Sequence, residues 1–156
     1  MRFFDHALET MPPKAIEALQ IEKLRSMFKK IYGHNRFYTE KFDSAGIDHE
    51  AIQNVNDMAQ IPLTNKEELI KAQQYNPPFG SNATFPESAY SRFHQTSGTT
   101  GKPLRVLDTP ESWEWWGRCW GFVLTGAGLT ENDRLFVPFS FGPFIGFWAA
   151  LEGARI

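Results

Sequence analysis

The sequence holds 156 residues, of which 42% are hydrophobic and 22% charged, and its formal net charge is −2. This composition predicts one soluble globular domain with a core and excludes an intrinsically disordered chain. A net charge this close to zero gives no electrostatic basis for binding nucleic acid or an anionic membrane, and the single cysteine, Cys119, excludes an intramolecular disulfide.

The first 80 residues are predicted to form a helical lead-in. Pro12 and Pro13 stand where a helix can begin, because residues of the first turn need no amide hydrogen. Apolar residues then recur at helical spacing up to Gly33, where the helix is expected to end. They are Ile16, Leu19, Leu24, Met27, Phe28 and Ile31.

Two shorter helices are expected before residue 80. The first would carry Phe37 and Phe42 on one face and end at Gly46. The second would begin at Thr64, because Thr64 and Glu67 have the spacing of a capping box, in which each side chain bonds to the backbone amide of the other.

From about residue 90 the pattern changes. Residues 90–95 and 104–107 are predicted strands on either side of a polar loop. Thr109 and Pro110 are suited to begin a helix. Large apolar residues follow them at helical spacing, which indicates burial in a core or an interface: Trp113, Trp116, Trp120 and Leu124.

The last part of the chain continues this alternation. Residues 133–139 are predicted to be a buried strand, and residues 144–151 an apolar helix. Strands that alternate with helices are typical of a parallel α/β sheet. We therefore predict an α/β fold in which the helical lead-in (1–80) precedes the start of a mainly parallel sheet flanked by helices, a partial nucleotide-binding subdomain (81–156).

The loop between the first two predicted strands has the composition of a phosphate-binding loop. It reads Thr96-Ser97-Gly98-Thr99-Thr100-Gly101-Lys102-Pro103. Glycines let backbone amides turn towards an anion, hydroxyls donate to phosphate oxygens, and a lysine offsets their charge. It is not a Walker A loop, whose glycines have four residues between them. The alternative is a flexible Gly/Ser/Thr hairpin or linker.

Residues 97–103 resemble the phosphate-binding signature of the adenylate-forming superfamily, which includes acyl-CoA synthetases, luciferases and peptide-synthetase adenylation domains. Residues 37–46 and the run Ile61-Pro62-Leu63-Thr64-Asn65-Lys66-Glu67-Glu68-Leu69 are similar to the N-terminal region of its phenylacetate-CoA ligase branch, which includes coenzyme F390 synthetases. The resemblance extends from about Leu24 to the end of the chain.

This resemblance implies an AMP-forming ligase. An aryl or arylacetic acid would react with ATP to give an acyl-adenylate, and the acyl group would pass to the thiol of coenzyme A. The nucleotide would be bound, with Mg²⁺ bridging its phosphate oxygens, by Thr96, Ser97, Gly98, Thr99, Thr100, Gly101 and Lys102. The family's motifs for adenine, ribose and the catalytic lysine do not occur in these 156 residues. The resemblance therefore assigns no catalytic residue and no metal ligand here, and it implies that the chain alone is inactive.

A second candidate site lies at the turn after the predicted strand 133–139. Ligands of parallel sheets bind beyond the carboxyl ends of the strands. Gly142 would permit a close approach, and Phe141 and Phe144 would line a pocket for an aromatic acyl group; plain core packing is the alternative. His94, just before the loop, is expected to be a strand residue with a satisfied hydrogen bond.

Neither a signal peptide nor a membrane-spanning segment is predicted. Asp5 and His6 interrupt the apolar N-terminus, and the apolar region 136–151 is broken by Pro138 and Gly142 and is shorter than the ~20 residues that a spanning helix needs. We expect a soluble, cytoplasmic protein without nucleic-acid or membrane partners. The chain stops directly after an apolar helix, so we expect the remainder of an enzyme to follow it and, through uncovered aromatic surface, self-association into a homodimer.

Three alternatives stay open. The first is an adenylate-forming enzyme with another acceptor, such as a hydroxyl compound or a carrier protein. The second is a non-catalytic binding protein that retains the loop, and the third is a small helical interaction protein with a flexible Gly/Thr hairpin. A downstream Tyr-Gly-x-Thr-Glu segment and a lysine-bearing terminal domain would favour the ligase.

Overall fold

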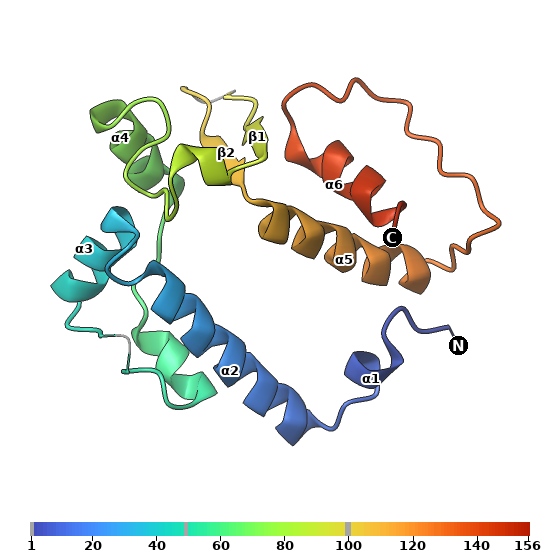
Figure 1. The fold of residues 1–156 in the computed structure, drawn as a ribbon, viewed down its shortest axis with the longest axis horizontal. Coiled ribbons are helices and arrows are strands. Elements are labelled where there is room, and N and C mark those ends of the chain that lie inside the picture. Colours follow the sequence, from blue (N-terminus) through green and yellow to red (C-terminus); the bar gives the residue numbers. More distant parts are fainter. Residues whose placement is uncertain (1, 49, 99–100) are drawn as a thin grey trace. The chain divides into compact units, whose positions relative to one another are not determined.

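The computed structural model describes residues 2–48, 50–98 and 101–156, and it divides into two compact units (Figure 1). One unit is Met11–Glu87, and the other joins Met1–Thr10 to Ser88–Ile156. The predicted division at residue 80 into a helical lead-in and an α/β subdomain stays a prediction.

The unit Met11–Glu87 is helical. Its elements are α2 (Pro13–Ile31), α3 (Arg36–Ser44), the 3₁₀ helix η1 (Val55–Gln60) and α4 (Lys66–Tyr75), and a short 3₁₀ helix, η2 (Glu87–Ala89), follows them. The helices expected after Pro12 and around Phe37 are therefore confirmed.

Two phenylalanines form the centre of the core of this unit. Phe28 of α2 and Phe42 of α3 are 1% and 3% exposed, and their rings stack with centroids 4.8 Å apart. Ile47 and Ile52, from the chain after α3, are buried in the same cluster. Burial of these four apolar side chains holds α2 and α3 together.

The buried Asn35 fixes the start of α3. Its Oδ1 accepts a hydrogen bond from the amide of Tyr38 at 3.1 Å, which caps the helix. Its Nδ2 donates to the carbonyl of Asn82 at 2.7 Å and to the hydroxyl of Thr84 at 3.0 Å. One side chain thus ties the helix to a segment almost fifty residues away.

Helix α4 begins one residue later than predicted. Asn65, not Thr64, is the N-cap, and Glu68, not Glu67, completes the capping box. The amide of Glu68 donates to Asn65 Oδ1 at 3.0 Å, and the amide of Asn65 donates to Glu68 Oε2 at 2.8 Å. Asparagine ranks above threonine as an N-cap, which accounts for the shift.

The second unit combines helices with a small sheet. Its elements are α1 (His6–Glu9), β1 (Arg92–Gln95), β2 (Arg105–Asp108), α5 (Pro110–Gly126) and α6 (Ile145–Gly153). Strands β1 and β2 pair antiparallel, with Arg92 opposite Asp108 and His94 opposite Val106. The mainly parallel sheet is not confirmed, because the only sheet within the described residues is this antiparallel pair. The connection between the strands is too short for the crossover that parallel strands require.

Residues 133–139, predicted to be a buried strand, form no strand among the described residues. The segment lies in the long connection between α5 and α6 and has no regular structure (Figure 1). Phe136 is 84% exposed and Phe139 is 60% exposed. The apolar character suits a strand, but a strand also needs a neighbour for its backbone groups, and none of the described segments pairs with it.

Helices α5 and α6 lie side by side in the second unit and approach closely at glycines (Figure 1). A Cβ on Gly153 of α6 would overlap the Cβ of Trp120 on α5, and a Cβ on Gly117 would come within 2.6 Å of Ile156 Cδ1. Trp113 of α5 is buried, and its Nε1 donates to Glu152 Oε2 at 3.1 Å. The expected burial is confirmed for Trp113. Trp116, in contrast, is 41% exposed.

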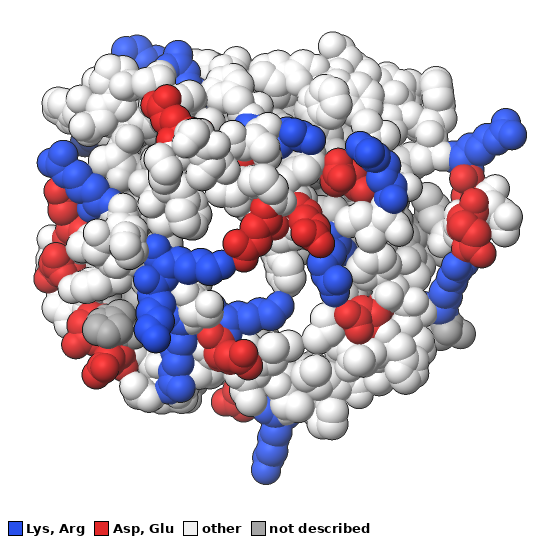
Figure 2. Space-filling view, in the orientation of Figure 1, with Lys and Arg blue, Asp and Glu red and all other residues white. Residues whose placement is uncertain are grey.

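Positive and negative side chains are interspersed over the face that Figure 2 shows, in keeping with the net charge of −2. In the part of the chain that the structure describes, no helix combines the length and hydropathy needed to cross a membrane.

Candidate functional site

The predicted phosphate-binding loop joins the two strands of the hairpin. At its base the amide of Thr96 donates to the carbonyl of Leu104 at 2.9 Å, and the amide of Leu104 donates to the Thr96 hydroxyl at 3.0 Å. The first bond continues the backbone pairing of β1 and β2 by one residue pair, and the second adds a side-chain bond to it. The loop therefore starts from a fixed base on the sheet.

Gly98 occupies a position that only glycine fits without strain. Its φ is +68°, in the left-handed region. A Cβ there would lie 2.9 Å from the carbonyl oxygen of Gly101 and 3.0 Å from the ring of Pro103. The amide of Gly101 also donates to the carbonyl of Gly98 at 2.9 Å, so the two glycines fold the loop back on itself.

The polar groups of the loop are available to a ligand. Ser97, Gly101 and Lys102 are exposed, and neither the Ser97 hydroxyl nor the Lys102 ammonium bonds to another of the described residues. A hydroxyl and an ammonium that bond to no other described residue are suited to bind an anion. Thr99 and Thr100, also predicted to bind phosphate, lie outside the described residues.

A second segment reaches the end of β1 next to the loop. The amide of Gln95 donates to the carbonyl of Pro143 at 2.9 Å. This bond places the start of α6 against the strand and leaves a cavity of about 200 Å³ between them. We call it the loop cavity; it is lined by His94, Gln95, Thr96, Val106, Phe144, Ile145 and Gly146.

The loop cavity brings together residues from both predicted sites. Thr96 was predicted to bind the nucleotide and Phe144 the acyl group, and both line the cavity. Phe141 and Gly142 are not among its lining residues: the Phe141 ring packs edge-on against Trp148 of α6 at 4.9 Å between centroids, and the Gly142 carbonyl accepts a bond from Trp148 Nε1 at 2.8 Å. Val106 and Ile145 were not predicted, because their positions give no signal beyond ordinary strand and helix burial.

His94 is the polar side chain buried at this cavity, and the expectation that it has a hydrogen bond is wrong. It is 4% exposed, and neither Nδ1 nor Nε2 has a partner among the described residues. Its ring stacks on Trp113 with centroids 5.1 Å apart and an interplanar angle of 22°. Burial lowers the pKa of His94; the carboxylate of Asp108 opposes this shift, and Arg92 adds to it. The imidazole is therefore mainly neutral at pH 7.

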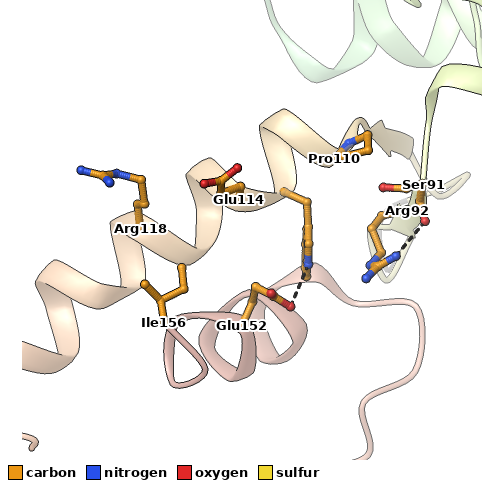
Figure 3. A pocket seen from close by; sticks show the side chains of 8 residues that line it. Ser91, Arg92, Pro110, Glu114, Arg118, Glu152 and Ile156 are labelled. Carbon is orange, nitrogen blue, oxygen red and sulfur yellow. Dashed lines mark hydrogen bonds between the residues drawn. The ribbon is translucent and has the colours of Figure 1, made fainter. Parts of the chain in front are cut away.

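A larger cavity of about 440 Å³ lies along α5 in the same unit (Figure 3). Side chains of both charges line it, among them Arg92, Glu114, Arg118 and Glu152. Arg118 is already paired with Asp5 at 3.1 Å. None of the residues predicted for the nucleotide or the acyl group lines this cavity, so it does not coincide with the candidate site.

Within residues 2–48, 50–98 and 101–156, no group of three or more His, Cys, Asp or Glu side chains is placed to hold a metal ion.

Comparison with known proteins gives curated relatives along most of the chain. The chain is 32% identical over 148 residues to the phenylacetate-coenzyme A ligase of Escherichia coli (strain K12), and 32% and 31% identical over the same length to those of Thermus thermophilus and Pseudomonas putida. The matched region is 95% of this chain but only 33% of the E. coli protein. The resemblance predicted from the sequence is confirmed, and the chain spans about a third of these relatives' length. No family model matches the chain.

Solved structures of a CoA ligase match the fold of this chain. An open conformation of 2-hydroxyisobutyryl-CoA ligase in complex with 2-HIB-AMP and CoA matches 99% of this chain and 36% of its own, with a TM-score of 0.90 and 26% identity. The same ligase in the thioesterification state matches 94% of this chain and 31% of its own, with a TM-score of 0.86 and 28% identity. The hairpin, the loop and the helices around them are thus an arrangement found in a CoA ligase.

Proposed function

We propose that the protein to which this chain belongs is an AMP-forming acid–thiol ligase, which activates an aryl or arylacetic acid with ATP and transfers the acyl group to coenzyme A. The main support for the proposal is that a polar loop and an apolar cavity lie next to each other. Exposed loop residues suited to bind an anion follow directly after Thr96, and Thr96 also lines an apolar cavity with Phe144. The relatives that share this region are phenylacetate-CoA ligases.

The loop residues would hold the phosphate tail of ATP. The ammonium of Lys102 and the hydroxyl of Ser97 would bind the β- and γ-phosphates, together with Thr99, Thr100 and the amides beside Gly98. Charge moves onto the pyrophosphate as it leaves, and donors that are already in place stabilise that charge without reorganisation. Mg²⁺ would enter bound to the phosphate oxygens of ATP, which suits its preference for substrate phosphates over an all-protein site.

The proposed reaction has two steps. A carboxylate oxygen of the acid attacks the α-phosphorus of ATP, the bond to the bridging oxygen breaks, and pyrophosphate leaves. The sulfur of coenzyme A then attacks the acyl carbon, its proton is released, and AMP leaves as the thioester forms. The part played by the loop is to hold the nucleotide so that its α-phosphate meets the carboxylate in line.

The loop cavity would hold the hydrocarbon part of the acid. Its volume is about 200 Å³, and a dry cavity of about 150 Å³ is known to accept benzene. A six-membered ring with a short carboxylate arm therefore matches the space beside Thr96. Phe144 would form one wall, with Phe141 and Gly142 behind it on the turn that leads to α6.

The proposal extends to the fold of the complete protein. The exposed segment 133–139 carries Phe136 and Phe139 at its surface, which is unfavourable in a finished domain. We place this segment in a mainly parallel sheet whose other strands come from the rest of the protein. Pairing would satisfy its backbone groups and cover both rings.

A small aliphatic hydroxy acid is the second candidate substrate, because the matching solved structures include 2-hydroxyisobutyryl-CoA ligase. Acid-dependent exchange of labelled pyrophosphate into ATP by the complete protein distinguishes the two. We expect exchange with phenylacetate to exceed exchange with 2-hydroxyisobutyrate at least tenfold. The reverse order would select the hydroxy acid, and no exchange with any acid of an aryl, arylacetic and aliphatic panel would contradict the ligase.

A further inference from the structure

The loop cavity contains a buried side chain that the proposed mechanism does not yet use. His94 is 96% buried and lines the cavity, and neither of its ring nitrogens has a partner in the described parts of the chain. We propose that His94 is a substrate-orienting residue, which donates a hydrogen bond to the carboxylate of the acid bound in the loop cavity. This inference rests on the proposed function.

A buried imidazole without a hydrogen bond is unfavourable in a protein interior, and an apolar side chain of the same shape would avoid the penalty. The surroundings of His94 do not supply the missing bond. Trp113 covers one face of the ring, and Val106 and Phe144 are apolar neighbours across the cavity. The Asp108 carboxylate is close enough to act on the charge of the imidazole but makes no hydrogen bond to it, and its own Oδ2 is buried without a partner among the described residues. A polar group that enters with a ligand would satisfy the imidazole.

The position of His94 relative to the loop suits a carboxylate. Residues two apart on an extended chain lie on the same face, so His94 and Thr96 face the cavity together, about one strand repeat apart. An acid whose apolar part lies against Phe144 therefore has its carboxylate close both to His94 and to the start of the phosphate-binding loop. That is the place where an attack on the α-phosphate would occur.

The ring can turn a nitrogen towards such a ligand at small cost. Both nitrogens are shielded in the present orientation. The torsion about the Cβ–Cγ bond of histidine has two broad wells, and a half-turn exchanges the nitrogens with ring carbons while the ring plane stays stacked on Trp113. A bound carboxylate would select the orientation that directs a donor into the cavity.

The charge state of His94 agrees with this role. Burial lowers the pKa of the imidazole, with Asp108 opposing and Arg92 adding to the shift. A neutral imidazole has one N–H donor. It can fix the direction of a carboxylate through one hydrogen bond. A full ion pair with a charged imidazole would make the carboxylate less nucleophilic.

The test uses the complete protein with His94→Phe, which keeps the ring and its stack on Trp113 but removes the donor, and His94→Gln, which restores an N–H. The matched control is His34→Gln, because His34 is exposed. In pyrophosphate exchange we expect His94→Phe to raise the KM for phenylacetate at least tenfold, with the KM for ATP within twofold of wild type. His94→Gln should recover part of the loss, and the control should match wild type.

A second readout does not depend on activity or on a variant that folds. In wild-type protein labelled with ¹⁵N-histidine, saturating phenylacetate should shift the ring resonances of His94 and leave those of His34 in place. Equal effects of His94→Phe on both KM values, or an unmoved His94 resonance, would overturn the inference and leave the proposed function standing. Wild-type protein with no acid-dependent exchange at all would overturn both.

Discussion

Lys102 is the charged residue on which the proposed nucleotide-binding role of the loop most depends. Its side chain is exposed and pairs with none of the described carboxylates, so its ammonium is available to phosphate. We expect Lys102→Ala to slow acid-dependent pyrophosphate exchange by the complete protein by two to three orders of magnitude, the effect of losing a preorganised donor worth about 3 kcal/mol. The melting temperature should not change. Lys14→Ala, at an exposed lysine on α2, is the control, and an unchanged rate for Lys102→Ala would remove this residue from the mechanism.

Gly98 tests the shape of the loop. Alanine at its φ of +68° costs about 1–2 kcal/mol, and the added Cβ would also press on the Gly101 carbonyl. Gly98→Ala should therefore lower the exchange rate even under conditions in which the variant stays folded, since the backbone amides would move away from the phosphates. Gly126→Ala, where nothing lies within 4 Å of the new Cβ, should be neutral in both assays. Full activity in Gly98→Ala would show that the loop does not need this conformation.

Glu68 gives a prediction about pH. The ammonium of Lys41 donates to both its carboxylate oxygens, at 2.7 and 2.8 Å, and together with the amide of Asn65 it lowers the pKa of Glu68. A lowered pKa in the folded state means that this carboxylate stabilises the fold above the unfolded value of about 4.3, and that the contribution is lost as the pH falls through the folded pKa.

Glu68→Gln should therefore melt at a lower temperature than wild type at pH 7, and the difference should shrink as the pH is lowered below about 4. The measurement is a thermal melt across this pH range. Glu67→Gln, on the exposed side of the same turn, is the control and should behave like wild type at every pH. If the difference in melting temperature between Glu68→Gln and wild type stays constant with pH, the ion pair with Lys41 does not contribute to stability.

At the scale of elements, the contact of α5 with α6 determines where the loop cavity lies, because α6 begins at its wall. Gly153→Ala would force the new Cβ into Trp120 and push the helices apart. We expect a loss of about 1–3 kcal/mol of unfolding free energy, as for other overpacked cores. Gly146→Ala, on the same helix with nothing within 4 Å, should be neutral or stabilising by up to about 1 kcal/mol in a denaturant titration. Equal stabilities of the two variants would contradict the close helix contact.

Helices and their ends were largely predictable, because spacing and capping residues act locally. Residues Thr109 and Pro110 begin α5 as expected, and the Thr109 side chain accepts from the amide of Ser112. The exception at α4 was a choice between adjacent caps, Thr64 and Asn65, which sequence spacing alone does not resolve. Local rules therefore account for most of the helix starts in both units.

The strands were harder to predict, since a strand depends on partners that are distant in sequence. Residues 133–139 have the apolarity of a buried strand but find no partner among the described residues. Of the candidate acyl-site residues, Phe144 lines the loop cavity, whereas Phe141 and Gly142 pack on α6. The turn precedes α6 but follows no strand among the described residues, and packing against α6 decides the direction of each side chain.

At the scale of the whole molecule, the chain accounts for about a third of the length of its curated relatives. In the proposed enzyme it would contribute groups for the phosphates and one cavity, and the sequence holds none of the recognised motifs for adenine or ribose. Phosphate contacts alone do not orient the α-phosphate, and orientation is a large part of the rate. We expect the isolated 156 residues to release no acid-dependent pyrophosphate.

Product analysis is the most direct test of the ligase. The complete protein is incubated with phenylacetate, ATP, Mg²⁺ and coenzyme A, and the nucleotides and thioesters are identified by mass spectrometry, beside the isolated chain under the same conditions. The predicted result is equal amounts of AMP and phenylacetyl-CoA from the complete protein and neither product from the isolated chain. Formation of ADP in place of AMP, or consumption of ATP without any thioester from the whole acid panel, would contradict it.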